Sequence, residues 1–241
     1  FYAVHHGPDG LEAMARRVRR LRQALAAALR ALGCGVDAGP GFDTVVVRGE
    51  AVPQLLQRAL TAGFNLRRGL DGRAGIASAE ALAISLDERS TPAELERLLL
   101  ALAGDGTDGT GADGAAAPAL DAFRRTLEAG DDACWPQELP ARRRPWLTQP
   151  VFHRHRSETE LLRYIQRLSS RDFSLVHGMI PLGSCTMKLN AAAELVPVSW
   201  PAFNAIHPYA PADQLAGYRA LAADLEAWLA AITGFAAVSL Q

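Results

Sequence analysis

Met179–Asn190 reads MIPLGSCTMKLN, and this stretch is the most informative part of the 241-residue chain. It holds the only lysine, and a hydroxyl, a thiol and a second hydroxyl come shortly before that lysine. The residues concerned are Gly183, Ser184, Cys185, Thr186 and Lys188. Hydroxyl groups can donate hydrogen bonds to a carboxylate or a phosphate, and a glycine lets the backbone approach such a group closely. An ordinary turn uses the same residue types, so the pattern alone predicts a ligand site and a turn equally.

Motifs on both sides of this stretch extend the pattern. Ser157–Glu160 and Leu162–Tyr164 precede it, and Trp200–Pro201, Ile206–Tyr209 and Leu225–Leu229 follow it. In this order the segments resemble the P-protein family of the glycine cleavage system, whose signature reads PLGSCTMKLN. Earlier segments fit the same family, namely Tyr2–Val4, His6–Pro8, Gly10–Leu11, Phe42–Thr44, Asn65–Arg67 and Ile84–Glu88. The resemblance covers nearly the whole chain, which corresponds to a middle portion of the longer family protein.

The resemblance implies an α/β protein of the fold type I class of pyridoxal-phosphate-dependent transferases. It also implies an internal fragment that spans the junction between a non-catalytic first half and a catalytic second half. The expected parts are a small α/β domain at 1–103, a flexible low-complexity loop and connector at 104–150, and the truncated start of the catalytic half at 151–241. Residues 104–118 are mostly Gly, Asp, Thr and Ala, which cannot bury enough apolar surface to offset the entropy of ordering.

The family's reaction is the decarboxylation of glycine with pyridoxal 5'-phosphate, followed by transfer of the aminomethyl group to the lipoyl group of the H-protein. The resemblance therefore implies an oxidoreductase with glycine and lipoylated H-protein as partners, and a homodimer at full length. The family's Schiff-base lysine lies downstream of Gln241, so we assign no catalytic residue and expect the fragment alone to be inactive. A non-catalytic scaffold or interaction module is the alternative.

Six residues are candidates for a position near the substrate or the cofactor: Gly183, Ser184, Cys185, Thr186, Lys188 and His207. Lys188 could form a Schiff base by residue type, but the resemblance favours a structural or electrostatic role near the cofactor entrance. The spacing of Ser184 and Lys188 is one residue too long for a Ser-x-x-Lys acyl-enzyme motif. His207 could orient a substrate or cap a backbone carbonyl, and both roles stay open.

Charge and composition argue against several classes of protein. Lysine and arginine number 25 against 26 acidic residues, so the net charge favours neither nucleic acid nor an anionic membrane as a partner. No apolar run approaches the roughly 20 residues of a membrane helix. Three cysteines with unrelated spacing indicate reduced thiols, and hence the cytoplasm, or the mitochondrion in a eukaryote. His153 and His155 alternate with arginines, whose charge argues against a metal site.

Apolar periodicity predicts the helices. A long amphipathic helix is expected over Asp9–Leu32, with Asp9 and Glu12 as a capping box and Gly33 as its left-handed end. Its arginines fall between the apolar positions and are expected to form a solvated face: Arg16, Arg17, Arg19, Arg20 and Arg22. Further helices are expected at 52–60, after Thr91, around Phe123, after Ser157 and over 213–232.

Runs of β-branched and apolar residues predict strands at 44–47, 64–67, 83–86 and 236–240. Residues 179–211 show little periodicity and contain five prolines, which indicates an irregular stretch with a function. In the helix after Ser157, the apolar side chains are expected to pack inward, namely those of Leu161, Leu162, Ile165 and Leu168.

Overall fold

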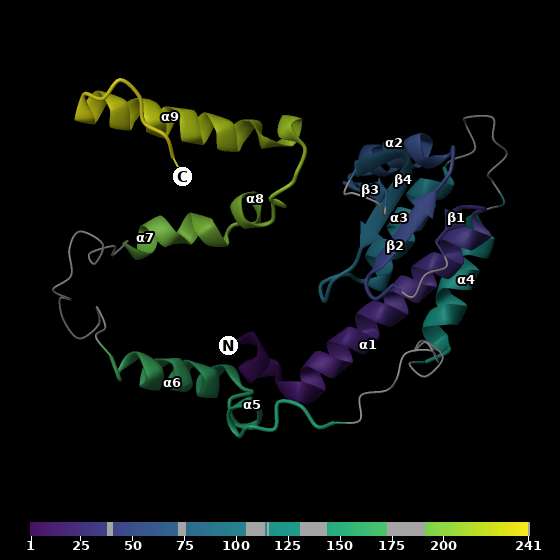
Figure 1. Ribbon diagram of the computed structural model, residues 1–241, viewed down its shortest axis with the longest axis horizontal. Helices are drawn as coiled ribbons and strands as arrows, with labels where there is room; N and C mark the ends of the chain where they lie inside the picture. Colours follow the sequence, from purple (N-terminus) through teal and green to yellow (C-terminus); the bar gives the residue numbers. More distant parts are fainter. Residues whose placement is uncertain are drawn as a thin grey trace. The chain divides into compact units, whose positions relative to one another are not determined.

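The computed structural model describes residues 1–37, 41–71, 76–104, 114, 116–130, 144–172 and 191–240 (Figure 1). The chain divides into two compact units, Phe1–Phe173 and Ser174–Gln241. The first unit is mixed α/β, as the sequence predicts. Within the described ranges, no helix combines the length and the apolar composition that a membrane-spanning segment requires.

The first unit contains an antiparallel sheet with the strand order β1-β2-β4-β3. Its strands are β1 (Gly35–Val36), β2 (Thr44–Arg48), β3 (Arg67–Asp71) and β4 (Ile76–Ser85). β2 pairs with β4 from Thr44 opposite Ser85 to Arg48 opposite Ala81. The strand predicted at 44–47 is confirmed, and the one predicted at 83–86 is the end of the longer β4. The two-residue β1 carries too little sequence pattern to be predicted.

The strand predicted at 64–67 is displaced, because Phe64 closes the end of the preceding helix. That helix is α2 (Val52–Thr61). It is followed by Gly63, which takes the left-handed conformation with φ +85°. The Phe64 N–H donates to the Ala59 carbonyl at 2.8 Å, and the Gly63 N–H donates to the Leu60 carbonyl at 3.0 Å. This is the hydrogen-bond pattern of a Schellman motif. Phe64 packs against the core, and β3 begins only at Arg67.

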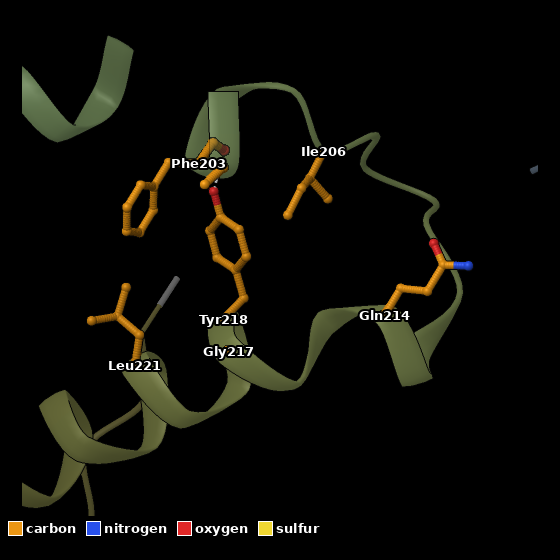
Figure 2. Close-up of a pocket in the computed structure, with 7 residues that line it drawn as sticks. Phe203, Ile206, Gln214, Gly217, Tyr218 and Leu221 are labelled. Carbon is orange, nitrogen blue, oxygen red and sulfur yellow. Dashed lines mark hydrogen bonds between the residues drawn. The ribbon is translucent and has the colours of Figure 1, made fainter. Parts of the chain in front are cut away.

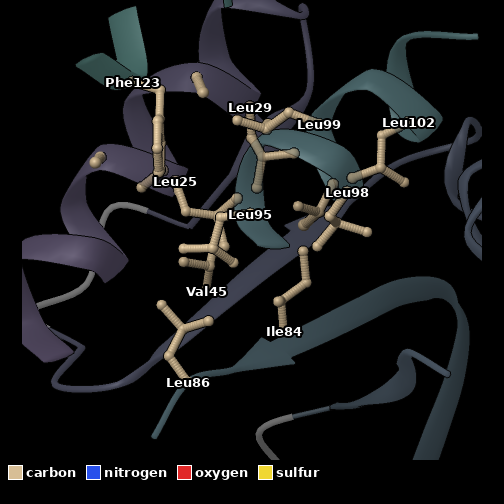
Figure 3. Close-up of a cluster of buried hydrophobic side chains, with 14 of the residues drawn as sticks. Leu25, Leu29, Val45, Ile84, Leu86, Leu95, Leu98, Leu99, Leu102 and Phe123 are labelled. Atoms are coloured by element: carbon tan, nitrogen blue, oxygen red, sulfur yellow. The ribbon is translucent and has the colours of Figure 1, made fainter. Parts of the chain in front are cut away.

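The sheet shares one hydrophobic core with α1 (Tyr2–Ala31), α2, α3 (Pro92–Ala103) and α4 (Ala116–Glu128). Figure 3 shows side chains of α1, α3 and α4 converging on Val45 of β2 and Ile84 of β4, namely those of Leu25, Leu29, Leu95, Leu99 and Phe123. α3 begins as predicted, because the Thr91 hydroxyl accepts from the Glu94 N–H at 3.2 Å and Pro92 occupies the first turn.

α4 confirms the helix predicted around Phe123, and it lies inside the range 104–150 predicted as loop and connector. Phe123 is 0% exposed and Ala119 is 1% exposed, and α4 packs along α1. Ala119 and Phe123 are one helical turn apart, so both lie on the face of α4 that points towards the core. The core therefore continues beyond residue 103, and the predicted flexible segment 104–118 is wrong at its end, where Ala116 already begins a helix. Residues 105–113 and 115 lie outside the described residues.

The arginines of α1 do not form a solvated face. Arg19 and Arg22 are buried, with exposed fractions of 4% and 8%. Arg19 donates to the Gly41 carbonyl at 3.1 Å, and Arg22 donates to the Thr44 carbonyl at 3.3 Å. The prediction is wrong because the loop before β2 covers this side of α1, and its carbonyls need donors once they leave water. Burial, and then repulsion from Arg19 and Arg30, lower the pKa of Arg22, although an arginine still stays charged at neutral pH.

Two further arginines of α1 have different partners. Arg17 donates to the carbonyls of Glu88 and Ser90, each at 2.6 Å, and so holds the turn between β4 and α3. Arg16 pairs with Glu12 at 2.7 Å, one helical turn away, and the two side chains are 40% and 52% exposed. Exposed pairs of this kind contribute little to stability, on the order of 0.5 kcal/mol.

The start of α1 differs from the prediction. A short helical segment begins at Tyr2, and Gly7, with φ +63° and ψ −177°, interrupts it with a kink, so the long helix starts at Pro8, one residue before the predicted Asp9. The predicted capping box of Asp9 and Glu12 is wrong, because Asp9 lies within the helix after the kink. Its Oδ2 atom accepts instead from Nη1 of Arg156 at 3.0 Å. The other end of the helix is as predicted, with Gly33 at φ +81°.

Arg156 fills the space at this kink. It lies between α5 (Val151–Arg154) and α6 (Glu158–Ser169). A Cβ atom on Gly7 would lie 2.5 Å from Nη2 of Arg156 and 2.7 Å from the carbonyl oxygen of Phe152. Both contacts are shorter than real Cβ contacts allow, so only glycine fits here. The connection between α5 and α6 therefore packs directly against α1.

α6 starts as predicted but does not bury its apolar face. The Ser157 hydroxyl accepts from the Glu160 N–H at 3.3 Å and caps the helix. Leu162 is 58% exposed and Ile165 is 37% exposed. The predicted inward packing is wrong because the core cluster of the first unit includes no residue of α6.

The second unit has short helical turns followed by one long helix. They are α7 (Ala192–Leu195), the 3-10 helix η3 (Val196–Ser199), α8 (Pro201–Asn204), the 3-10 helix η4 (Ala212–Leu215) and α9 (Ala216–Thr233). The helix predicted over 213–232 is confirmed, with a 3-10 first turn and an end at the left-handed Gly234. The strand predicted at 236–240 is wrong. Its segment runs back along α9 (Figure 1), where the Leu240 N–H donates to Oε1 of Glu226 at 3.2 Å.

Replacing Phe123 with Ala tests whether α4 belongs to the core. We expect the variant to lose about 3–5 kcal/mol of unfolding free energy, because a fully buried phenylalanine leaves a cavity. Phe42→Ala is the matched control, since Phe42 is 48% exposed and should cost less than about 1 kcal/mol. Urea unfolding followed by circular dichroism gives both values. Equal stabilities for the two variants would place α4 outside the core.

A comparison of Gly7→Ala with Gly33→Ala tests whether Arg156 and Phe152 pack tightly against Gly7. Both glycines have positive φ, but a Cβ on Gly33 would meet nothing within 4 Å. Gly33→Ala should therefore cost only the left-handed strain, about 1 kcal/mol, and Gly7→Ala should cost about 3 kcal/mol because Phe152 and Arg156 must also move. Thermal unfolding compares the two. Equal losses would mean that the chain at Gly7 rearranges freely.

Candidate functional site

The structure describes only His207 among the six predicted site residues. Gly183, Ser184, Cys185, Thr186 and Lys188 lie outside the described residues, and their role near a substrate or cofactor stays a prediction. His207 lies in the second unit, between α8 and η4. The geometry around it is therefore where the candidate site can be built.

His207 is the first residue of a tight turn, and its ring accepts a hydrogen bond from the backbone of that turn. The Ala210 N–H donates to the His207 carbonyl at 2.9 Å, which closes a β-turn with Pro208 in the second position. The Tyr209 N–H donates to Nδ1 of His207 at 3.0 Å. The sequence analysis considered that the His207 ring donates to a backbone carbonyl. The structure shows the reverse, because Nδ1 of the ring accepts from a backbone N–H. The His207 and Tyr209 rings lie 5.8 Å apart, centroid to centroid.

A hollow of about 360 Å³ lies next to this turn, between α8 and the start of α9 (Figure 2). It is lined by Ala202, Phe203, Ile206, Gln214, Gly217, Tyr218 and Leu221. The Tyr218 hydroxyl donates to the Phe203 carbonyl and so joins α9 to α8 (Figure 2). The lining carries no charged side chain, so it can hold an apolar or aromatic group, and the Tyr218 hydroxyl already donates to the Phe203 carbonyl.

The sequence placed Tyr218 and Leu221 only on the apolar face of a helix. Their part in the hollow depends on where the chain returns after η3, which periodicity does not encode. The signal that could have found the hollow is the pair of family-matching strings, Trp200–Pro201 and Ile206–Tyr209, which flank α8.

The cofactor that the resemblance implies is pyridoxal phosphate, which needs an amine to hold it and donors for its phosphate. The only lysine of the chain is Lys188, which lies outside the described residues. The hollow offers neither lysine nor arginine in its lining. The hollow alone therefore does not fit a site for this cofactor.

His153 in α5, His155 just after it and Cys34 after α1 have structural contacts within the first unit. Nε2 of His153 lies 2.8 Å from the Leu147 carbonyl, and His155 stacks on Tyr164 with centroids 4.3 Å apart. Burial raises the pKa of the Cys34 thiol, so little reactive thiolate forms there at neutral pH. In the part of the chain that the structure describes, no group of three or more His, Cys, Asp or Glu is arranged to hold a metal ion.

Family-matching segments that are distant in sequence meet in the first unit. Next to His6–Pro8, Asp9 contacts Arg156, which immediately precedes Ser157–Glu160. In the same way, the Tyr2 hydroxyl donates to Oε1 of Glu88 at 3.2 Å and so joins Tyr2–Val4 to Ile84–Glu88. The sequence analysis missed both contacts, because separations of 147 and 86 residues leave no local signal.

Residues 1–102 match the family model described as glycine cleavage system P-protein. A glycine dehydrogenase (decarboxylating) from Synechococcus sp. strain CC9902 is 56% identical over 241 residues, which are all of this chain and 24% of the relative. Proteins of the same name from Synechococcus sp. strain RCC307 and Gluconobacter oxydans strain 621H are 57% and 47% identical over 241 residues, again all of this chain and 23% of each relative.

The chain spans about a quarter of the length of the curated relatives that it matches. The matches run through the His207 turn and the Gly7 kink alike, since they cover every residue of the chain. The resemblance that begins with Met179–Asn190 is thereby confirmed: the whole chain is similar to part of these relatives, and residues 1–102 are similar to the glycine cleavage system P-protein family.

Proposed function

We propose that this chain is part of an enzyme that decarboxylates glycine with pyridoxal phosphate and transfers the aminomethyl group to the lipoyl group of the H-protein. The observation that carries the proposal is the identity of 56% over the whole chain to a glycine dehydrogenase (decarboxylating). Because the chain spans 24% of that relative, the proposal concerns a protein of the relatives' full length that contains this sequence.

Within that protein, the first part of the chain is a small domain whose core includes α4, a connector follows it, and residues 151–241 are the start of the catalytic half of a fold type I enzyme. Gly183, Ser184, Cys185, Thr186, Lys188 and His207 line the route to the cofactor. The Schiff-base lysine lies elsewhere in the protein. The active form is a homodimer, and its location is the cytoplasm, or the mitochondrion in a eukaryotic cell.

The alternative is a non-catalytic scaffold or interaction module. What favours it is the hollow beside α8, whose lining has no charged side chain. A scaffold of this kind would bind partners through packing and would need no cofactor. Covalent capture of the cofactor and measurements of turnover separate the two functions.

We expect no stoichiometric link between this 241-residue chain and pyridoxal phosphate. Lys188 is its only lysine, and an amine is a poor nucleophile unless burial or neighbouring charge lowers its pKa. Borohydride reduction of the chain with the cofactor, followed by mass spectrometry, decides the point. A phosphopyridoxyl adduct on Lys188 would overturn the assignment of the Schiff-base lysine to another part of the protein.

In the full-length protein, Ser184→Ala, Thr186→Ala and Lys188→Met should each lower kcat/KM for glycine about tenfold to a hundredfold. Each change removes a hydrogen bond to a charged group, worth about 1.5–3 kcal/mol. The visible absorbance of the bound cofactor should persist, because none of these residues is expected to hold it covalently.

Lys188→Arg is the matched variant, since it keeps the positive charge and should retain more activity than Lys188→Met. Gln54→Ala, an exposed position on α2, controls for general effects on the protein. Wild-type efficiency in all three loss variants would leave Met179–Asn190 as a plain turn.

A further inference from the structure

The turn at His207 fixes which nitrogen of the ring carries the proton. The Tyr209 N–H can only donate, and it lies 3.0 Å from Nδ1 of His207. Nδ1 must therefore be the acceptor, and a neutral imidazole with Nδ1 as acceptor carries its proton on Nε2. The backbone of the turn is held as well, because the Ala210 N–H donates to the His207 carbonyl at 2.9 Å.

A turn of this kind does not itself need an imidazole. Asparagine and aspartate in the first position accept from the same N–H with a shorter side chain and are common there. Histidine adds a second nitrogen, Nε2, on the side of the ring opposite the turn. His207 is exposed, and no described residue is recorded as a partner of Nε2. The turn therefore presents an oriented N–H donor to the outside.

We propose that His207 binds an anionic oxygen of a ligand through its Nε2–H, as a hydrogen-bond donor and not as a proton acceptor. The inference rests on the proposed function, whose substrate carries a carboxylate and whose cofactor carries a phosphate. The other residues of the turn, Pro208, Tyr209 and Ala210, carry no charge, so no neighbouring carboxylate in the turn competes for the donor.

His153 provides an internal control in the same chain. Its Nε2 lies 2.8 Å from the Leu147 carbonyl, which can only accept, so His153 carries its proton on Nε2 as well. That N–H is already used within the protein. An added anion should therefore leave His153 unchanged while it binds His207.

The test is long-range 1H–15N spectroscopy of the 241-residue chain with 15N-labelled histidine. We expect His207 to show the Nε2–H tautomer, and its Nε2 signal to shift saturably on addition of inorganic phosphate or of glycine. A response to phosphate alone assigns the donor to a phosphate group, and a response to glycine alone assigns it to a carboxylate. An Nδ1–H tautomer, or no response to either anion, overturns the proposal.

His207→Asn separates binding from the turn. The asparagine amide oxygen can accept from the Tyr209 N–H, so slow hydrogen exchange at that amide should persist. The variant lacks Nε2, so in the full-length protein it should bind the assigned anion about tenfold to a hundredfold more weakly. Unchanged affinity would contradict the donor role. The spectra need no turnover, so a failure of the proposed reaction would not be confused with a failure of this inference.

Discussion

The burial of α1 is the constraint on which the first unit depends. α1 contacts β1, β2, α3, α4 and α5, and its leucines at 21, 25 and 29 are at most 2% exposed. Each such side chain contributes roughly 1.5–3 kcal/mol when it leaves water. A helix covered on several sides also buries its polar positions, and an unsatisfied buried guanidinium is far more costly than a leucine is favourable. The carbonyls of Gly41 and Thr44 meet that demand for Arg19 and Arg22.

The features that the sequence predicts well are those with a local cause. Thr91 and Ser157 cap their helices, and Gly33 and Gly234 end theirs, because each signal lies within a few residues of the structure it sets. The failures need knowledge of which surfaces meet. The buried arginines, the place of α4 in the core and the exposed face of α6 depend on neighbours far along the chain.

The candidate site shows the same division. The sequence identifies His207 as a residue of interest and places it in a loop, but it does not say which nitrogen meets which backbone group. That choice depends on the fold of the turn, where Pro208 sets the backbone and the Tyr209 N–H faces the ring. The residues at 183–190 stand on the family resemblance and their chemistry alone, since they lie outside the described residues.

A match to a family string does not by itself mark an active site. His6–Pro8 matches the family as clearly as Ile206–Tyr209 does. In the structure, however, the residue types of the two strings have different physical explanations. A side chain at Gly7 would collide with Arg156 and with the Phe152 carbonyl, so packing alone accounts for glycine there. His207 has no such steric requirement, because a shorter polar residue would close the same turn. A residue type that packing and turn geometry leave unexplained is the stronger indication of a role in binding.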